Sequence, residues 1–184
     1  MKIWLTRHGQ TNLNNQRLMQ GHTNEPLNDT GRQQAREVGQ RLKDIKFDAI
    51  YSSPLCRAVE TAAIIGNIPM EEVTIDDRII EIDFGNYEMK NYDHLGLRMS
   101  AFWIWPEVIP APKTVEKVPD MVARCRDFLL EIKEKDYENV LVVCHGGIIR
   151  VLSGILEGRK NNLKWRPRPQ NCEVREYDTD NIRE

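Results

Sequence analysis

The chain has 184 residues, of which 40% are hydrophobic and 29% charged, as expected of a globular protein with one core. The formal net charge of −2 gives no reason to expect binding to nucleic acid or to an anionic membrane surface. No apolar run reaches the roughly 20 residues of a membrane-spanning helix, the N-terminus has no signal-like apolar segment, and the four cysteines form no Cys-x-x-Cys pair, so we expect a reduced, cytoplasmic protein.

The first half of the chain alternates apolar runs with helical patterns. Asn28 or Thr30 can cap the first helix, and Pro54 suits the first turn of the second, where a proline loses no helical hydrogen bond. In chain order the patterns predict a strand at residues 2–6, a helix over 30–45, a strand at 48–52, a helix over 54–66 and a short strand at 73–76.

The second half begins with residues 89–118, which are rich in aromatic residues and prolines and fit no regular element. The patterns that follow predict a helix over 119–135, a strand at 139–144, a helix over 147–157 and an edge strand at 172–177. This order predicts an α/β fold, a three-layer α/β/α sandwich with a mostly parallel central sheet. We expect residues 1–184 to form a single domain, with a cap-like excursion at about 86–118.

Three unusual segments follow predicted strands. Arg7-His8-Gly9 follows the first strand, Arg57 lies in the first turn of the helix after the second, and His145-Gly146-Gly147 follows the strand at 139–144. Ligands of open parallel sheets bind outside the carboxyl ends of the strands. We therefore expect these residues to lie on one rim, although they are far apart in the sequence.

The side chains on this rim suit a phosphate ligand. Two arginines can hold a phosphoryl group through charge-assisted hydrogen bonds, and helix N-termini near Arg57 and Gly147 add amide donors. A neutral imidazole among these charges can attack phosphorus as a nucleophile. Either histidine alone is more commonly structural, and Arg57 alone a surface residue, so the prediction depends on their occurring together. His22 and His94 have no such context and are expected on the surface.

Other chemistries lack their motifs. The sequence has no Gly-x-x-x-x-Gly-Lys-[Ser/Thr] loop of a P-loop kinase or ATPase, and no Gly-x-Gly-x-x-Gly follows a strand as in dinucleotide-binding proteins. The histidines are scattered and the rim holds more cations than carboxylates, which disfavours a catalytic metal. We therefore expect neither a metal nor another cofactor.

The segment Arg7-His8-Gly9-Gln10-Thr11 with Asn14 resembles the Arg-His-Gly-x-Thr-x-x-Asn signature of the histidine phosphatase superfamily, also called phosphoglycerate-mutase-like. The resemblance continues in the order typical of the family through Gln20-Gly21, Pro26-Leu27-Asn28, Gly31, Gln34-Ala35, Ser52-Ser53-Pro54-Leu55, Arg57-Ala58, Thr61-Ala62, Glu81, Asp83-Phe84-Gly85, Glu88, His145-Gly146-Gly147 and Ile149-Arg150. One such tripeptide would be weak evidence, whereas this ordered set, spanning residues 7–150, is specific.

The resemblance implies a role for each matching residue. His8 would be the nucleophile that takes up the phosphoryl group, and Glu81 the acid that protonates the leaving alcohol and then activates water. The phosphoryl oxygens would be held by Arg7, Asn14, Gln20, Arg57, His145 and Gly146. Without the other motifs Glu81 would be interpreted as a solvated loop carboxylate. Asp83 and Glu88 are expected to be structural.

Some positions depart from the family pattern. Val115-Glu116-Lys117 stands where many members have Gly-Glu-Ser, and Tyr87 and Met89 replace a frequent Trp and Gly. These departures concern the substrate-facing rim more than the phosphate pocket. Two further groups of residues leave their roles open. Phe102, Trp103 and Trp105 could pack over an organic group of the substrate or fix the excursion to the core, and Arg166 and Arg168 could meet a second anionic group or lie in a solvated loop.

The resemblance implies a metal-independent phosphatase of the histidine acid phosphatase type, acting on a small phosphate monoester. Phosphoglycerate mutases of the family carry longer insertions after the acid and near the C-terminus, so this short chain favours hydrolysis. The alternatives are a phosphoglycerate mutase-type isomerase and a non-catalytic protein that binds phosphorylated ligands. No residue selects among α-ribazole phosphate, a sugar phosphate, phosphoglycerate and broad specificity, and the oligomeric state stays open.

Overall fold

The computed structural model describes residues 1–182 of the chain. Within them, the centre is a five-stranded sheet in the order β3-β2-β4-β1-β5. β1 (Lys2–Arg7) and β2 (Ala49–Ser52) pair in parallel with β4 (Asn139–Cys144), and the short β3 (Thr74–Ile75) pairs in parallel with β2. β5 (Val174–Asp178) pairs antiparallel with β1 at the other edge. The mostly parallel sheet confirms the predicted α/β fold class.

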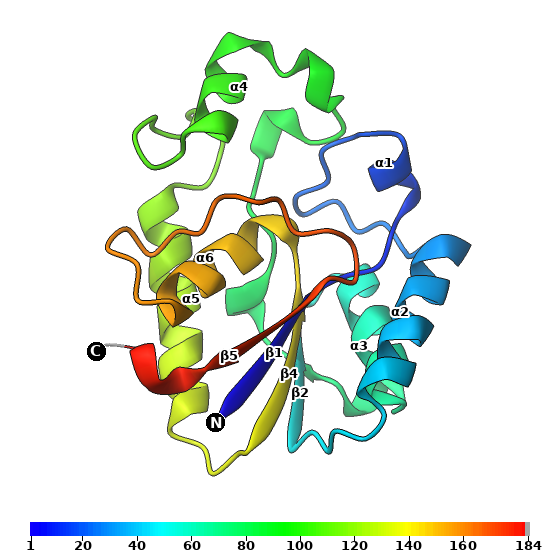
Figure 1. Cartoon of the computed structure of the whole chain (residues 1–184). Helices are drawn as coiled ribbons and strands as arrows, with labels where there is room; N and C mark the ends of the chain where they lie inside the picture. The colour runs from blue at the N-terminus through cyan, green and yellow to red at the C-terminus, as the bar shows by residue number, and fades with distance from the viewer. Residues whose placement is uncertain (183–184) are drawn as a thin grey trace.

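Helices cover both faces of the sheet (Figure 1). α2 (Asp29–Leu42) and α3 (Cys56–Gly66) pack together on one face, and α5 (Val118–Lys133) and α6 (Gly146–Leu156) pack together on the other. Each face has its own cluster of buried apolar side chains. These clusters form the two interfaces between the three predicted layers.

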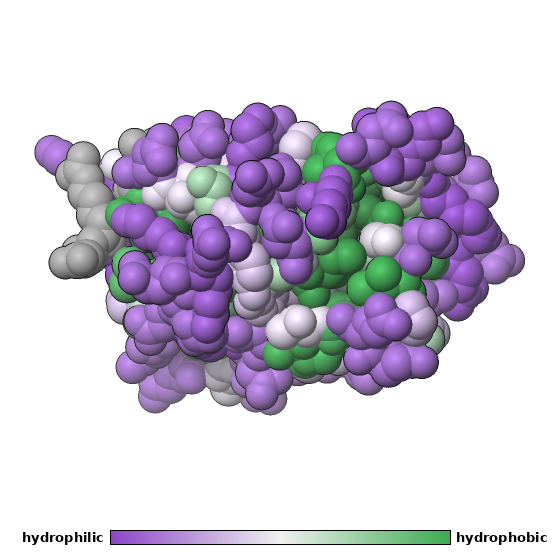
Figure 2. Space-filling view, turned by 90° about the horizontal axis from the view of Figure 1, so that it is seen from below, coloured by the Kyte–Doolittle hydropathy of each residue, from purple (hydrophilic) through white to green (hydrophobic). Residues whose placement is uncertain are grey.

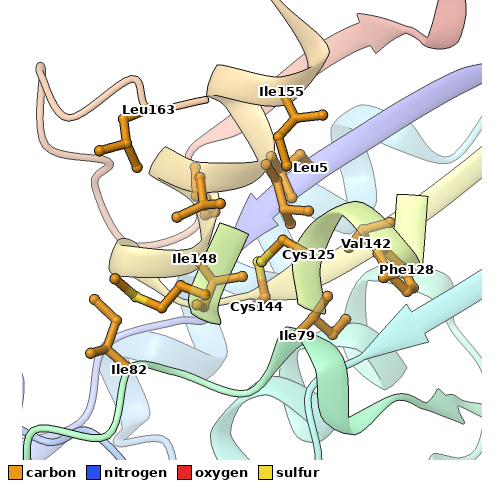
Figure 3. Packing of buried hydrophobic residues seen from close by; sticks show 14 of the residues in the cluster. Leu5, Ile79, Ile82, Cys125, Phe128, Val142, Cys144, Ile148, Ile155 and Leu163 are labelled. Atoms are coloured by element: carbon orange, nitrogen blue, oxygen red, sulfur yellow. The ribbon is translucent and has the colours of Figure 1, made fainter. Parts of the chain in front are cut away.

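The central strand β4 shows how an apolar run produces these layers. Successive side chains of a strand point to opposite faces. Val140, Val142 and Cys144 accordingly belong to one cluster, and Leu141 and Val143 to the other. Figure 3 shows Val142 and Cys144 on the side of α5 and α6. All five side chains are fully buried, and burial of each valine or leucine contributes about 1.5–3 kcal/mol to stability.

The first long helix, α2, is shorter than predicted. The Asn28 side chain accepts a hydrogen bond from Gly31 N at 2.9 Å, so Asn28 and not Thr30 is the N-cap. The helix ends at Leu42 instead of residue 45, because a turn in which Ile45 N donates to Leu42 O at 2.9 Å replaces the last helical turn.

The next helix also begins later than predicted. Leu55 has an extended backbone with φ −73° and ψ 130°, so α3 begins at Cys56 and Pro54 lies in the turn before it. The other predicted elements are found within two residues of their expected ends. The predicted edge strand is β5, the antiparallel strand of the sheet.

Two α-helices within residues 1–182 were not predicted. α1 (Asn12–Asn15) is a single turn, and α4 (Gly96–Ile104) lies within the segment expected to be irregular. Met99 and Phe102 of α4 are completely buried, so tertiary packing supports a helix that has no side-chain N-cap. In Figure 1, α4 lies beyond the carboxyl ends of the strands, apart from the helices that cover the sheet. The single domain with a cap-like excursion stays a prediction.

The opposite end of the molecule is shown in Figure 2, seen from below. Hydrophilic residues cover most of this end, with a patch of hydrophobic residues between them. Among residues 1–182, no helix is long and apolar enough to cross a membrane. The predicted site residues lie at the other end, toward α4.

Candidate active site

A pocket lies between the carboxyl ends of β1 and β4 and the helix α4. The predicted site residues that line it are Arg7, His8, Asn14, Gln20, Arg57, Glu81 and Gly146. The other lining residues are Gly21, Phe84, Tyr92, Trp103, Gly147, Arg150 and Arg168. The fold therefore brings the predicted cationic rim together from segments far apart in the sequence.

His8 directly follows β1, and its side chain is only 3% exposed. Its Nδ1 lies 2.7 Å from the carbonyl oxygen of Gly9. A carbonyl only accepts hydrogen bonds, so in the neutral ring Nδ1 carries the proton and Nε2 holds the free electron pair. Burial, together with the charges of Arg57 and Arg7, lowers the pKa of His8 well below its ordinary value. His8 is therefore a neutral imidazole in a cationic pocket.

The backbone around His8 is fixed by neighbouring elements. Gly9 N donates to Thr61 Oγ1 of α3 at 3.0 Å, and Asn171 Nδ2 donates to His8 O at 2.9 Å. A Cβ on Gly9 would lie 2.5 Å from the carbonyl oxygen of Gly31 in α2, so only glycine permits this approach. These contacts fix the backbone from which the imidazole projects into the pocket.

Arg7 and Arg57 are buried cations with unused donors. Arg57 donates to the carbonyl oxygens of Thr23 and Gly21 at 2.7 and 2.8 Å, and Arg7 Nη1 donates to Pro169 O at 2.9 Å. The Nε atom of each guanidinium has no partner among the described residues. Burial lowers the pKa of Arg7 to about 10, so the group is still charged at neutral pH. A bound anion would satisfy both groups.

Glu81 is held at the pocket wall by its buried neighbours. Ile79 and Ile82 are fully buried, whereas Glu81 is 9% exposed. Glu81 Oε2 accepts from Gly147 N at 3.2 Å, which places the carboxyl at the N-terminus of α6. Its Oε1 accepts from Ile82 N at 3.0 Å. His22 is exposed as expected, but its Nε2 lies 2.9 Å from the Glu81 carbonyl oxygen and so contacts the same loop.

His145 lies behind His8, with the ring centroids 5.1 Å apart. It is fully buried and is not among the residues that line the pocket. Its Nε2 lies 2.7 Å from Ser53 Oγ, while its Nδ1 has no partner in residues 1–182. Burial and the charge of Arg57 lower its pKa well below the ordinary value. Gly146 follows it and does line the pocket, so the predicted phosphate contact of His145 stays a prediction.

Two amide side chains complete the deep part of the pocket. Asn14 Oδ1 accepts from Thr11 N at 3.2 Å, and Gln20 is 6% exposed with no partner for its Oε1 among the described residues. Glu88 accepts from Thr23 N at 2.8 Å and so holds the loop that follows Gln20. This contact is consistent with a structural role for Glu88.

The aromatic residues of α4 and its C-cap residue Trp105 have different surroundings. Phe102 is fully buried, Trp103 lines the pocket, and Trp105 is 54% exposed. The ring of Phe84 meets Trp103 edge-on at 5.5 Å, and Tyr92 lies 6.0 Å from it. Trp103 thus forms the aromatic wall of the pocket, while Phe102 fixes α4 to the core.

Two further arginines line the pocket. Arg150 was not predicted as a site residue, although it follows Gly146 by four residues and so lies on the same face of a helix. Arg168 also lines the pocket although its side chain is exposed, so both roles considered for it stay open. Arg166 instead donates a hydrogen bond to a carbonyl oxygen of α4. The helical spacing of Arg150 was the signal available in the sequence.

The sequence matches the family model described as "Histidine phosphatase superfamily (branch 1)" over residues 3–183. The chain belongs to the histidine phosphatase superfamily. This superfamily member is therefore an enzyme of that family.

Relatives of this histidine phosphatase have several names. An adenosylcobalamin/alpha-ribazole phosphatase of Escherichia coli is 30% identical over 90% of this chain and 83% of its own length. Phosphoglycerate mutase-like protein 4 of Arabidopsis thaliana is 37% identical over 82% of this chain and 69% of its own. The crystal structure of a phosphoserine phosphatase mutant from Entamoeba histolytica in complex with phosphoserine superposes with a TM-score of 0.82 at 28% identity, covering 95% of this chain and 89% of that one. The shared fold extends over nearly the whole chain.

Proposed function

We propose that this histidine phosphatase hydrolyses a small-molecule phosphate monoester through a phosphohistidine on His8, with Glu81 as proton donor and with no metal ion. The observation that carries the proposal is the 2.7 Å contact between His8 Nδ1 and the carbonyl oxygen of Gly9. It leaves Nε2 unprotonated in a pocket whose wall also holds Arg7 and Arg57. A neutral nucleophile beside two cations suits attack on an anionic phosphorus centre.

In the first step, His8 Nε2 forms a bond to phosphorus while the bond from phosphorus to the ester oxygen breaks. Glu81 transfers its proton to that oxygen, which leaves as the alcohol. The free donors of Arg7 and Arg57 hold the phosphoryl oxygens during the transfer, with Asn14, Gln20 and the amide of Gly146 as further donors. His145 lies directly behind the nucleophile, and its proposed role is to stabilise the charge of the phosphoryl group during the transfer.

In the second step, water attacks the phosphohistidine. The Glu81 carboxylate takes a proton from the water, the new phosphorus–oxygen bond forms, and the bond between phosphorus and Nε2 breaks. Inorganic phosphate leaves and His8 returns to its neutral tautomer, because Nδ1 keeps its proton and donates it to the Gly9 carbonyl oxygen throughout. Atoms and charges are restored without a cofactor.

The names of the relatives support hydrolysis of small phosphate esters, since they include an alpha-ribazole phosphatase and a phosphoserine phosphatase. The likeness to a phosphoglycerate mutase-like protein keeps isomerisation as the second candidate. Both reactions pass through the same phosphohistidine and differ in the acceptor, which is water in one and a bound product in the other. Release of inorganic phosphate distinguishes them.

The test is hydrolysis of p-nitrophenyl phosphate in excess chelator by the wild type, His8→Ala and an Arg36→Gln control. Arg36 is an exposed residue of α2, away from the pocket. We expect turnover by the wild type and control that survives chelation, and its loss in His8→Ala. Loss of activity on chelation would overturn metal independence. Rapid quenching should trap a phosphoryl group on the wild type that is labile to acid and stable to base.

A further inference from the structure

Arg150 is the most deeply buried charge of the pocket that phosphoryl transfer does not use. Its side chain is 5% exposed, and its Nε and Nη1 have no hydrogen-bond partner among the described residues. It forms no ion pair with a carboxylate in residues 1–182. A buried, unpaired guanidinium is costly, because the charge has lost its hydration without gaining a counter-charge. Such a group calls for an anionic ligand.

Two indole rings hold this guanidinium in place. The Arg150 Cζ lies 4.2 Å from the ring centroid of Trp165 and 5.2 Å from that of Trp103. Trp165 Nε1 in turn donates to Trp103 O at 2.7 Å, so the two rings are fixed to each other. Cation–π contacts hold the faces of the guanidinium. Its edges, which carry the N–H donors, remain for a ligand in the pocket.

The position of Arg150 separates it from the residues around His8. Arg150 lies four residues after Gly146 on the same face of α6, about 6 Å farther along the helix. It packs against Trp103 of α4, whereas Arg57 is bound to the loop carbonyls of Gly21 and Thr23. The pocket therefore has one end at His8 and another at Arg150.

A second arginine lines the Arg150 end. Arg168 is exposed, and its Cζ lies 5.1 Å from the ring centroid of Tyr92, which also lines the pocket. Burial, and next the charge of Arg168, lower the pKa of Arg150 to about 10. The two cations therefore repel each other, and an anion bound between them would relieve this repulsion.

The charges that line the pocket exceed what a phosphate ester neutralises. Arg7, Arg57, Arg150 and Arg168 face a single carboxylate, that of Glu81. A phosphate monoester carries about −1.5 to −2 charges at neutral pH. With the dianion bound, one positive charge is left over when Glu81 is ionised, and two are left over when Glu81 carries the proton of the first step. The excess lies at the Arg150 end of the pocket.

We infer that Arg150, assisted by Arg168, binds a carboxylate carried by the substrate, so that the substrate is a phosphate monoester of a small carboxylic acid. This inference rests on the proposed function, because it places the ester phosphorus at His8 and the second anion at Arg150. A carboxylate matches the planar guanidinium, and Arg168 at the pocket wall adds charge where the ligand enters.

The test compares O-phosphoserine with O-phosphoethanolamine, which lacks only the carboxylate. In the wild type we expect kcat/KM to be at least about tenfold higher for phosphoserine, since hydrogen bonds to charged groups contribute factors of roughly 10 to 150. Arg150→Gln should lower kcat/KM for phosphoserine at least about tenfold more than for phosphoethanolamine, mainly through KM. Equal losses on both substrates would overturn the inference and make Arg150 a packing residue.

Two further variants test the carboxylate subsite if Arg150→Gln does not fold. Arg168→Gln changes an exposed side chain and should reduce the preference for phosphoserine several-fold, whereas Arg36→Gln should leave it unchanged. If no phosphate ester is hydrolysed at all, the proposed function fails. Calorimetric titration of the wild type and Arg168→Gln with both compounds then decides the subsite. Tighter binding of phosphoserine that is weakened in the variant supports it, and equal binding of the two compounds overturns it.

Discussion

The backbone amide of Gly147 donates to Glu81 Oε2 at 3.2 Å, and this contact holds the carboxyl at the first turn of α6. The absence of a side chain at position 147 makes the contact possible. A Cβ there would lie 2.6 Å from Glu81 Oε1 and 2.4 Å from Ile82 Cδ1. The same helical turn follows directly after His145. The N-terminus of α6 therefore fixes the positions of both Glu81, the proposed acid, and His145, which supports the nucleophile.

Gly147→Ala is therefore expected to displace Glu81 and lower kcat by up to about 100-fold, because small misplacements of reacting groups have effects of that size. Overpacking should also lower the free energy of unfolding by about 1–3 kcal/mol. The matched change is Gly146→Ala, whose Cβ would meet nothing closer than Arg7 Nε at 3.5 Å. Steady-state kinetics and urea unfolding should show the larger loss for Gly147→Ala. Equal losses would contradict the role given to position 147.

The pH–rate profile should be bell-shaped, with an acidic-to-neutral optimum. His8 must be neutral to attack, and its pKa lies well below the ordinary value of 6.5, so activity should persist on the acid side of that value. Glu81→Gln should remove most of the rate together with the alkaline limb, because a glutamine cannot donate a proton to the leaving oxygen. A profile that is flat from about pH 5 to pH 8 would contradict this pairing of roles.

An NMR titration can check the acid limb without catalysis. Burial lowers the pKa of His8 most, and Arg57 lowers it next. Arg57→Gln should therefore raise the pKa of the imidazole part of the way toward its ordinary value, while the exposed Arg36→Gln should not change it. An unchanged pKa in Arg57→Gln would show that the charge of this arginine does not reach the nucleophile.

The fold followed from local patterns, whereas parts of the site did not. The apolar run of β4 predicted a strand buried on both faces, and the segments after β1, β2 and β4 predicted one rim. α4 was missed because its nine residues have no side-chain cap and depend on long-range burial of Met99 and Phe102. A short helix of this kind has no strong local signal.

The orientation of side chains in the site also could not be predicted from the sequence. The predicted phosphate contact of His145 stays a prediction, and the sequence did not indicate that its Nε2 lies 2.7 Å from Ser53 Oγ with its ring 5.1 Å from that of His8. Arg150 was matched to the family motifs but given no role, because which face of α6 meets the pocket depends on how Trp103 and Trp165 pack. Both outcomes are set by contacts between distant segments.

Stability should fall as the solution is acidified below about pH 6.5. Burial lowers the pKa values of His8 and His145 in the folded state, so the unfolded chain binds more protons than the folded one below the unfolded value of 6.5. Each histidine should then remove about 1.4 kcal/mol of stability per pH unit until its own folded pKa is reached. Urea unfolding between about pH 7.5 and pH 5 measures this slope. His145→Asn should reduce it, and an unaltered slope would show that His145 is not buried as a neutral group.

Arg124 should prove to be the residue that positions the loop leading to Glu81. Its Nη1 donates to the carbonyl oxygens of Arg78 and Ile80 at 2.6 and 2.8 Å. Its Nε and Nη2 donate to the two carboxylate oxygens of Glu116 at 2.7 and 2.9 Å, within the segment that departs from the family pattern. Both side chains are less than one-fifth exposed, so this is a buried pair in which loss of one partner leaves an uncompensated charge.

Arg124→Met is therefore expected to lower the free energy of unfolding by about 3–5 kcal/mol and to lower kcat more than it raises KM, because the displaced loop carries the acid and not the phosphate ligands. Glu116→Gln keeps the loop carbonyls bonded and should lose less of both. A double-mutant cycle should give a coupling energy of about 1–3 kcal/mol between the two positions. Proportionate changes in kcat and KM, or additive losses of stability, would mean that Arg124 does not act on Glu81 through this loop.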